Sequence, residues 1–197
     1  MNTEIITKSY PQPPFCEKEI LRYAGCKAAN EETQLLLQSC IDEAKCRLLY
    51  NVCWRELTFD TDGNVCNFGL FSFSSEKLAK NLCGCKSVIL FCATVGIAMD
   101  RLIAKYNRLS PARAVMLQAL GSERVEALCN SFCEDMMKSR NITLRPRFSP
   151  GYGDLPLAVQ RDIFSVLDCS KRLAVFLNDS LLMSPSKSVT AFAGICE

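Results

Sequence analysis

The feature that most constrains the fold is an uncharged, largely apolar run over residues 88–95, which lies between Gly84 and Gly96. Its length and its β-branched residues are typical of a buried strand, so it predicts the central strand of a sheet. The longest uncharged apolar stretch, residues 87–99, is well short of the ~20 residues that a membrane-spanning helix requires. The chain is therefore not expected to enter a membrane.

Helix-start signals predict two longer helices. Asn30 can cap a helix whose first turn carries two glutamates, and the apolar residues of this helix recur at helical spacing. These residues are Leu37, Ile41, Ala44 and Leu48. Ser110 followed by Pro111 opens another helix, which we expect to run to Lys138 with a bend or interruption near Gly121. Its candidate core residues are Val115, Leu120, Leu128, Phe132 and Met136.

The remaining segments complete an α+β pattern. In chain order they are an extended arm over 1–14, helices over 17–23, 74–84, 97–106 and 156–167, and strands over 52–59, 65–73, 172–177 and 188–195. We expect a hairpin turn at residues 60–63 and an N-terminal cap from Asp154 for the helix at 156. The order is neither βαβ-periodic nor all-β, so the prediction is a largely antiparallel twisted sheet flanked by helices, in one domain spanning residues 1–197.

Composition excludes several kinds of chemistry. The chain has no histidine, so Ser-His-Asp catalysis, Cys-His catalysis and histidine-ligated metal centres are impossible. Thirteen cysteines are an odd number, and no secretory signal opens the sequence, so we expect a reduced, cytoplasmic protein. Cys83, Cys85, Cys129 and Cys133 could bind a soft metal, but without matching CxxC pairs we predict structural thiols and no metal site. A net charge of +2 without a basic run argues against nucleic-acid binding.

An irregular segment over residues 147–156 is the strongest candidate for a binding site, because long irregular loops in compact domains commonly bind ligands. Arg147 can hold a carboxylate through two hydrogen bonds. Gly151 allows close backbone approach to a ligand, and Tyr152 adds an aromatic face that attracts cations. The alternative is a proline-stiffened turn whose arginine pairs with a surface acid, and the residues alone leave both interpretations open.

Four motifs, taken in order, resemble a known family. They are residues 88–96 followed by Asp100, residues 114–120 with 125–127, Arg-Phe-Ser-Pro-Gly-Tyr-Gly-Asp-Leu-Pro-Leu at 147–157, and Ser-Lys-Ser-Val-Thr-Ala at 186–191. The sequence resembles the activation domain of cobalamin-dependent methionine synthase, and most closely the free-standing activation proteins. The match covers roughly residues 85–197 well and residues 1–84 loosely.

The resemblance implies a domain that binds S-adenosylmethionine (AdoMet). Arg147 takes the position of the family residue that contacts the AdoMet carboxylate, Glu126 that of an acid near its amino group, and Gly151 and Tyr152 those of the loop beside the ligand. The chain departs from the family at Asn141, where a further acid is common. It also departs at residues 192–193, Phe-Ala, where large synthases carry aromatic residues.

The resemblance also implies partners. We expect a cobalamin-dependent methionine synthase that lacks its own activation domain, with a flavodoxin- or ferredoxin-type electron donor. Methyl transfer from AdoMet to reduced cobalt moves no proton, so a chain without histidine and without catalytic residues is compatible with it. The alternatives are a reactivator of another corrinoid methyltransferase, an AdoMet or corrinoid sensor, and a cysteine-based redox protein.

Overall fold

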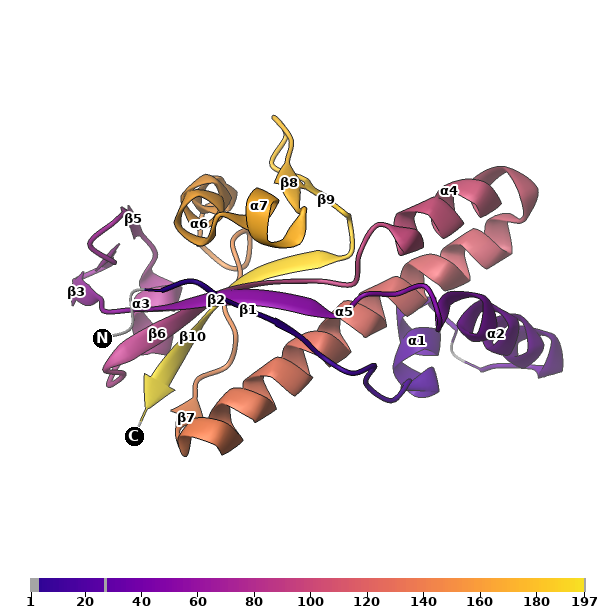
Figure 1. Ribbon diagram of the computed structural model, residues 1–197, viewed down its shortest axis with the longest axis horizontal. Helices are drawn as coiled ribbons and strands as arrows, with labels where there is room; N and C mark the ends of the chain where they lie inside the picture. Colours follow the sequence, from indigo (N-terminus) through magenta and orange to yellow (C-terminus); the bar gives the residue numbers. More distant parts are fainter. Residues whose placement is uncertain (1–3, 27, 197) are drawn as a thin grey trace.

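The computed structural model describes residues 4–26 and 28–196, and at its centre is a five-stranded antiparallel sheet (Figure 1). The strands in spatial order are β1 (Ile6–Ser9), β2 (Asn51–Leu57), β6 (Ser87–Thr94), β10 (Ser188–Cys196) and β7 (Thr143–Leu144). All eight residues of β6 are buried, which confirms the central strand predicted at 88–95. The expected α+β class is likewise confirmed.

The central strand is apolar on both faces because helices cover both. Ile89, Phe91 and Ala93 point into one hydrophobic core, and the alternate residues Val88, Leu90 and Cys92 point into another. The first core is shared with α1 (Glu17–Tyr23), α2 (Glu31–Ala44), α4 (Ala98–Leu109) and α5 (Pro111–Arg140). The second core is shared with α3 (Glu76–Leu82), η1 (Leu157–Val159), α6 (Gln160–Leu167) and α7 (Cys169–Leu173).

Helix α5 is the longest element and runs diagonally from the helical end of the molecule to β7 (Figure 1). Its 30 residues form one continuous helix, so the interruption expected near Gly121 is wrong. A Cβ atom at Gly121 would lie 2.8 Å from Met99 Cγ and 2.9 Å from the Lys187 side chain. Gly121 therefore allows the side chains of Met99 and Lys187 to pack directly against the backbone of α5. Val115 is 54% exposed and is not a core residue, whereas Leu120, Leu128, Phe132 and Met136 are buried as predicted.

The N-terminal arm contains a strand that the three prolines of residues 1–14 did not predict. Residues 6–9 form β1 and pair with β2, with Ile6 opposite Trp54. The proline segment that follows is fixed to α5, because the buried Arg124 guanidinium donates to the carbonyls of Pro13 and Pro14 at 2.6 and 2.7 Å. Residues 1–3 of the expected arm lie outside the described residues.

Two other expected strands are wrong in their extent. The segment predicted as a turn at 60–63 and a strand at 65–73 forms three short strands, β3 (Asp60–Asp62), β4 (Val65–Asn67) and β5 (Ser72–Ser74). The chain leaves the strand after β4 because Phe68 turns inward and packs on Phe192, with ring centroids 5.1 Å apart. The strand predicted at 172–177 is divided between the end of α7 and β8 (Phe176–Leu177), which pairs with β9 (Met183–Ser184).

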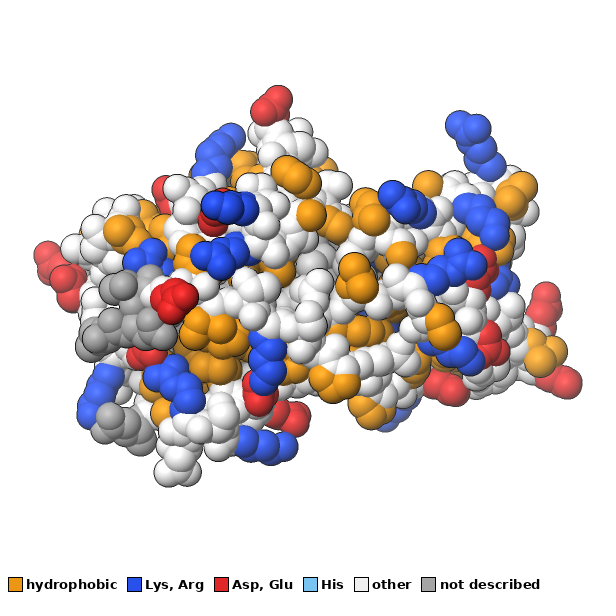
Figure 2. All heavy atoms as spheres, in the orientation of Figure 1, with side chains coloured by type: hydrophobic (Ala, Val, Ile, Leu, Met, Phe, Trp, Pro, Cys, Tyr) orange, Lys and Arg blue, Asp and Glu red, His pale blue; other side chains and the backbone are white. Residues whose placement is uncertain are grey.

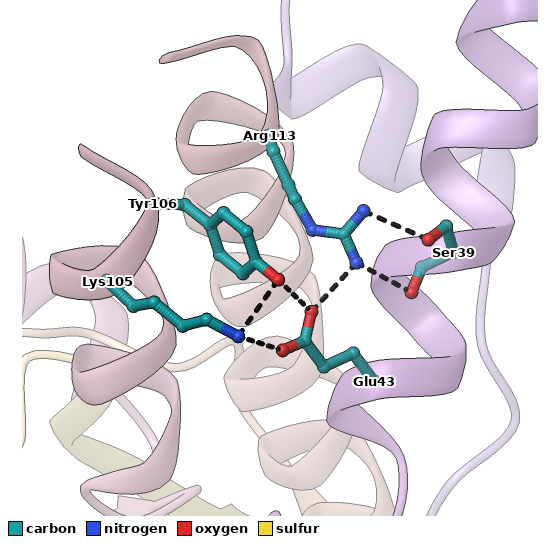
Figure 3. Close-up of polar contacts among 5 residues, drawn as sticks. All are labelled: Ser39, Glu43, Lys105, Tyr106 and Arg113. Atoms are coloured by element: carbon teal, nitrogen blue, oxygen red, sulfur yellow. Dashed lines mark hydrogen bonds and ion pairs between the residues drawn. The ribbon is translucent and has the colours of Figure 1, made fainter. Parts of the chain in front are cut away.

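The predicted helices are otherwise present. Asn30 caps α2 by accepting from the Thr33 backbone N–H at 2.9 Å, and Leu37, Ile41 and Ala44 are buried on it. Leu48 is also buried but lies beyond the end of the helix at Ala44. A polar cluster joins α2 to α4 and α5, in which Glu43 accepts hydrogen bonds from Lys105, Tyr106 and Arg113 (Figure 3). These hydrogen bonds hold α2 and α4 against the N-terminal end of α5.

Basic and acidic side chains are interspersed over the face drawn in Figure 2. Within residues 4–26 and 28–196, no helix is long and apolar enough to span a membrane. All thirteen cysteines fall in these ranges and are free thiols. The same part of the chain contains no cluster of three or more Cys, Asp or Glu residues arranged to hold a metal ion.

Candidate functional site

A cavity of about 690 Å³ lies between α5 and the segment over residues 144–152. Its volume is in the range of small-molecule sites, which are roughly 300–1,000 Å³. The predicted residues Glu126, Arg147 and Tyr152 all line it, together with Asn130 and Ser149. The structure therefore brings together side chains from two segments that are some twenty residues apart in the sequence.

Arg147 is the central side chain of this cavity. Its guanidinium donates to Glu126 Oε2 at 2.9 Å and to Asn130 Oδ1 at 2.8 Å, and it lies 3.9 Å from the Cys133 sulfur. Glu126, Asn130 and Cys133 follow one another at spacings of four and three residues, so they share one face of α5. The helix thus presents an acid and an amide to the loop arginine.

The direction of Arg147 is set by its neighbour in the chain. Phe148 exchanges two backbone hydrogen bonds with Phe192 of β10, each 2.9 Å long, and its side chain is buried in the second core. In an extended segment alternate side chains point to opposite faces. Arg147 and Ser149 therefore point away from that core and into the cavity.

The glycine-tyrosine bend closes on itself through backbone hydrogen bonds. Tyr152 N donates to Ser149 O at 3.1 Å, and Gly151 N donates to Leu155 O at 2.9 Å. Gly151 has φ +85°, a conformation that favours glycine, and it contributes backbone only. Tyr152 is 66% exposed, lines the cavity, and rests edge-on against Phe148 with centroids 5.2 Å apart.

Asp154 anchors the bend to another helix. Its carboxylate accepts from Ser75 Oγ at 2.6 Å and from the Glu76 backbone N–H at 2.8 Å, at the start of α3. The cap expected from Asp154 for the helix at 156 is therefore wrong, because the carboxylate caps α3 instead. The Ser75 hydrogen bond is the main cause that lowers the pKa of Asp154. The bend is thus held by an ionised side chain.

The thiols beside the site are neutral. Burial is the largest influence on the pKa of Cys129 and of Cys133, and it raises both above the ordinary value of 9.0. At neutral pH the charges facing Arg147 are therefore carboxylates such as Glu126, and the two thiols act as packing groups.

A second cavity of about 400 Å³ lies beyond the ion pair. It shares Glu126, Asn130 and Arg147 with the first cavity, and its other side includes Pro14 and Tyr23. The Arg147–Glu126 pair therefore borders open space on two sides. Its side chains are 24% and 43% exposed, respectively.

Of the four predicted site residues, Glu126, Arg147 and Tyr152 line the cavity and Gly151 does not, whereas Asn130 lines it without having been predicted. Asn130 bonds Arg147 directly, and its position four residues after Glu126 on one helix is the signal that could have identified it. The two departures from the family lie elsewhere. Asn141 is the left-handed C-cap of α5, with φ 51°, and Phe192 is fully buried among the rings of the second core.

The second motif, residues 186–191, is built into the turn before β10. The Ser186 backbone N–H donates to the Asp100 carboxylate at 3.1 Å, and Ser188 Oγ donates to Pro185 O at 2.8 Å. Lys187 Nζ donates to Ser122 Oγ at 3.1 Å. Asp100, singled out with the motif at 88–96, therefore positions this turn.

Comparison with known proteins supports a shared fold. No protein-family model matches the chain, and no curated protein matches it. Among solved structures, the chain is similar to a crystal structure of the MetH reactivation domain bound to AdoHcy, with a TM-score of 0.68. The match covers 97% of this chain and 78% of that one, at 16% sequence identity. The chain therefore has the fold of the MetH reactivation domain, and the resemblance inferred from the motifs is confirmed at the level of fold.

Proposed function

We propose that this protein binds AdoMet in the cavity between α5 and residues 144–152 and presents its methyl group to a cobalamin held by a separate methionine synthase. The proposal rests on one observation: the Arg147–Glu126 pair lines a ligand-sized cavity in a fold whose relative binds AdoHcy. AdoHcy is AdoMet without its transferable methyl group. A site that accepts one has most of the contacts needed for the other.

The charges of the pair match the amino-acid end of AdoMet. That end is a zwitterion, with a carboxylate and an ammonium on one carbon atom. The carboxylate would bind the Arg147 guanidinium, which supplies several N–H donors, and the ammonium would bind the Glu126 carboxylate. Because Arg147 and Glu126 are already 2.9 Å apart, the ligand would replace one ion pair by two without leaving a buried charge unpaired.

The rest of the cavity suits the remainder of the ligand. The exposed face of Tyr152 would lie against a cationic sulfonium or a flat adenine, both of which favour an aromatic ring. Apolar lining comes from Met137, Leu144 and Val189. These side chains would pack against the ligand and hold it in one orientation.

In this proposal the chain only binds and orients AdoMet. The sulfonium of AdoMet is a good leaving group and reduced cobalt is a strong nucleophile, so the transfer requires no acid or base. One electron from a flavodoxin- or ferredoxin-type donor would convert cob(II)alamin to the nucleophilic state. The absence of histidine therefore does not limit this function.

The partner would be a methionine synthase that lacks its own activation domain. Such a partner has to release this protein to meet its other substrates, so a modest interface is expected. In this arrangement the protein acts as an accessory subunit, and the cobalamin stays on the partner.

The test combines a binding measurement with a remethylation assay. Purified protein is titrated with AdoMet by calorimetry, and is then incubated with the cob(II)alamin form of a methionine synthase, reductant and AdoMet. Formation of methylcobalamin in the absorption spectrum supports the proposal. AdoMet binding without remethylation would instead support a sensor, or a reactivator of another corrinoid methyltransferase. Absence of AdoMet binding would refute the site itself.

A further inference from the structure

Two cysteines that are far apart in the sequence meet at the edge of the main sheet. Cys85 lies in the turn between α3 and β6, and Cys196 ends β10. Their sulfur atoms are 3.1 Å apart although the residues are separated by 111 positions. The backbone fixes the approach, because Lys86 N donates to Ile195 O at 3.1 Å.

A glycine makes room for this pair. A Cβ atom at Gly194 would lie 2.7 Å from Cys85 Sγ and 2.8 Å from Leu82 Cδ2, distances that real Cβ atoms do not adopt. The Cys85 sulfur therefore occupies the space that a side chain at residue 194 would fill. The pair is built into the packing of β10.

The charge of Arg145 interacts with both sulfur atoms. Arg145 is tied to this corner by its backbone N–H, which donates to Gly194 O at 2.8 Å, and by its guanidinium, which donates to Cys83 O at 3.0 Å. Burial is the main cause that raises the pKa of Cys85, and the Arg145 charge acts in the opposite direction. A cation in this position stabilises the thiolate, which is the reactive form.

The pair differs in accessibility from the cluster of three cysteines in the second core. Cys53, Cys92 and Cys169 are completely buried in the second core, where a soluble oxidant cannot reach them. Cys85 and Cys196 are partly exposed. They therefore combine a close partner sulfur, a neighbouring guanidinium and access to solvent.

We propose that Cys85 and Cys196 form a redox modification site, which a low-molecular-weight disulfide such as oxidised glutathione converts into an intramolecular disulfide. One protein thiolate attacks the glutathione disulfide, forming a mixed disulfide and releasing one glutathione. The second protein thiolate then attacks the protein sulfur of that mixed disulfide and releases the other glutathione. The protein dithiol is oxidised by two electrons, the oxidised glutathione is reduced to two thiols, and the two protons pass to those thiols.

The disulfide would join the end of β10 to the turn before β6. Arg145 also lines the main cavity, together with Arg147. The modification site is therefore adjacent to the candidate ligand site, but its chemistry does not depend on the proposed function.

The test is peptide mapping of the whole protein after equilibration with oxidised glutathione. Trypsin releases residues 81–86, which contain Cys83 and Cys85, and residues 188–197, which contain Cys196. We expect these peptides to be cross-linked in the non-reduced digest and to separate after reduction. The cross-link should persist in Cys83→Ser and disappear in both Cys85→Ser and Cys196→Ser, each of which should instead carry glutathione on the remaining cysteine.

Two results would overturn the proposal. One is glutathione bound only to the exposed cysteines Cys16, Cys46 and Cys83, with no cross-link. The other is a cross-link that requires Cys83 in place of Cys85. Arg145→Met should slow cross-linking several-fold at pH 7, since the cation no longer favours the thiolate. An unchanged rate would remove Arg145 from the site.

Discussion

Two glutamates three residues apart on α5 each pair with an arginine, but in opposite surroundings. Glu123 and Arg124 are buried, with side chains 5% and 0% exposed, and Arg124 also bonds the carbonyls of Pro13 and Pro14. Glu126 and Arg147 are 43% and 24% exposed and border two cavities. The same chemical pair therefore occurs once inside the core and once at an open site.

The two pairs differ in whether a ligand can replace their hydrogen-bond partners. Every nitrogen of the Arg124 guanidinium has a protein acceptor, and the side chain is fully buried, so a ligand cannot reach it. Arg147 and Glu126 can each exchange partners, because the cavity gives a ligand access to both. A buried, fully bonded pair fixes the chain, whereas an accessible pair can select a ligand.

The largest expected effect comes from breaking the buried pair. Arg124→Met leaves the Glu123 carboxylate buried without a countercharge, with the Cys16 backbone N–H still donating to it at 3.3 Å, and it removes the donors to Pro13 and Pro14. We expect a loss of about 3–5 kcal/mol in the free energy of unfolding, measured by urea denaturation. The double variant Arg124→Met/Glu123→Gln should recover part of this loss, because the uncompensated charge is gone. A loss below about 1 kcal/mol in the single variant would contradict the comparison.

Breaking the accessible Arg147–Glu126 pair should weaken ligand binding strongly and change the stability of the protein little. Arg147→Ala is expected to weaken AdoMet binding by roughly 30-fold to several-thousand-fold, the cost of truncating one partner of a desolvated charge pair. The free energy of unfolding should change by less than about 1 kcal/mol, since the pair is partly exposed. Calorimetry and urea denaturation measure the two quantities.

Arg140→Ala is the matched control for this variant. Arg140 also pairs with a glutamate, Glu56, at 2.7 Å, but it lies outside the main cavity. Its removal should leave AdoMet affinity unchanged. Equal affinities for the wild type and Arg147→Ala would show that the ligand site lies elsewhere.

Local patterns predicted the helices and the three central strands β2, β6 and β10 of the main sheet, because these elements depend on neighbouring residues. The apolar run of β6, the Asn30 cap and the Ser110–Pro111 start all act within a few positions. Predictions failed where a distant contact decides the outcome. Gly121 suggested a break in α5, but its role is to admit Met99 and Lys187, which come from other parts of the chain.

In the candidate site too, residues within a local motif were predicted and residues brought in by distant contacts were not. Arg147, Gly151 and Tyr152 form a contiguous motif, and the family resemblance added Glu126. Asn130 was missed although it lies four residues after Glu126 on the same helix face, because that spacing shows a shared face but not that the arginine contacts both residues. The partner of Asp154 was also wrong, since Ser75 and the start of α3 are some eighty residues away. No local pattern contains that information.

Glu43 forms another glutamate–arginine pair, with Arg113, and its lowered pKa makes the stability of the protein depend on pH. Burial is the largest single influence on Glu43 and raises its pKa, but hydrogen bonds from Arg113, Lys105 and Tyr106 together lower it to about 2 (Figure 3). A pKa below the ordinary value of 4.5 means that the stabilisation is complete above pH 4.5 and is lost as the pH falls toward 2.

Glu43→Gln should therefore reduce the free energy of unfolding by about 1–3 kcal/mol at neutral pH. It should also flatten the pH dependence between pH 4.5 and 2, measured by urea denaturation at several pH values. AdoMet affinity should stay unchanged, because the cluster is remote from the cavity residues. A steep acid transition that persists in the variant would assign it to other carboxylates.

The smallest effect is expected at the anchor of the glycine-tyrosine bend. Asp154→Asn removes the charge that accepts from Ser75 Oγ and the first backbone N–H groups of α3, so the bend carrying Tyr152 is held less firmly. Since Asp154 acts through Tyr152, we expect only a few-fold loss of AdoMet affinity by calorimetry, with Asp179→Asn on a distant exposed loop as the control. A loss as large as that of Arg147→Ala would mean that Asp154 contacts the ligand directly. In that case the open site would contain an acid beyond Glu126 and Glu134, and the ion pair alone would not explain its selectivity.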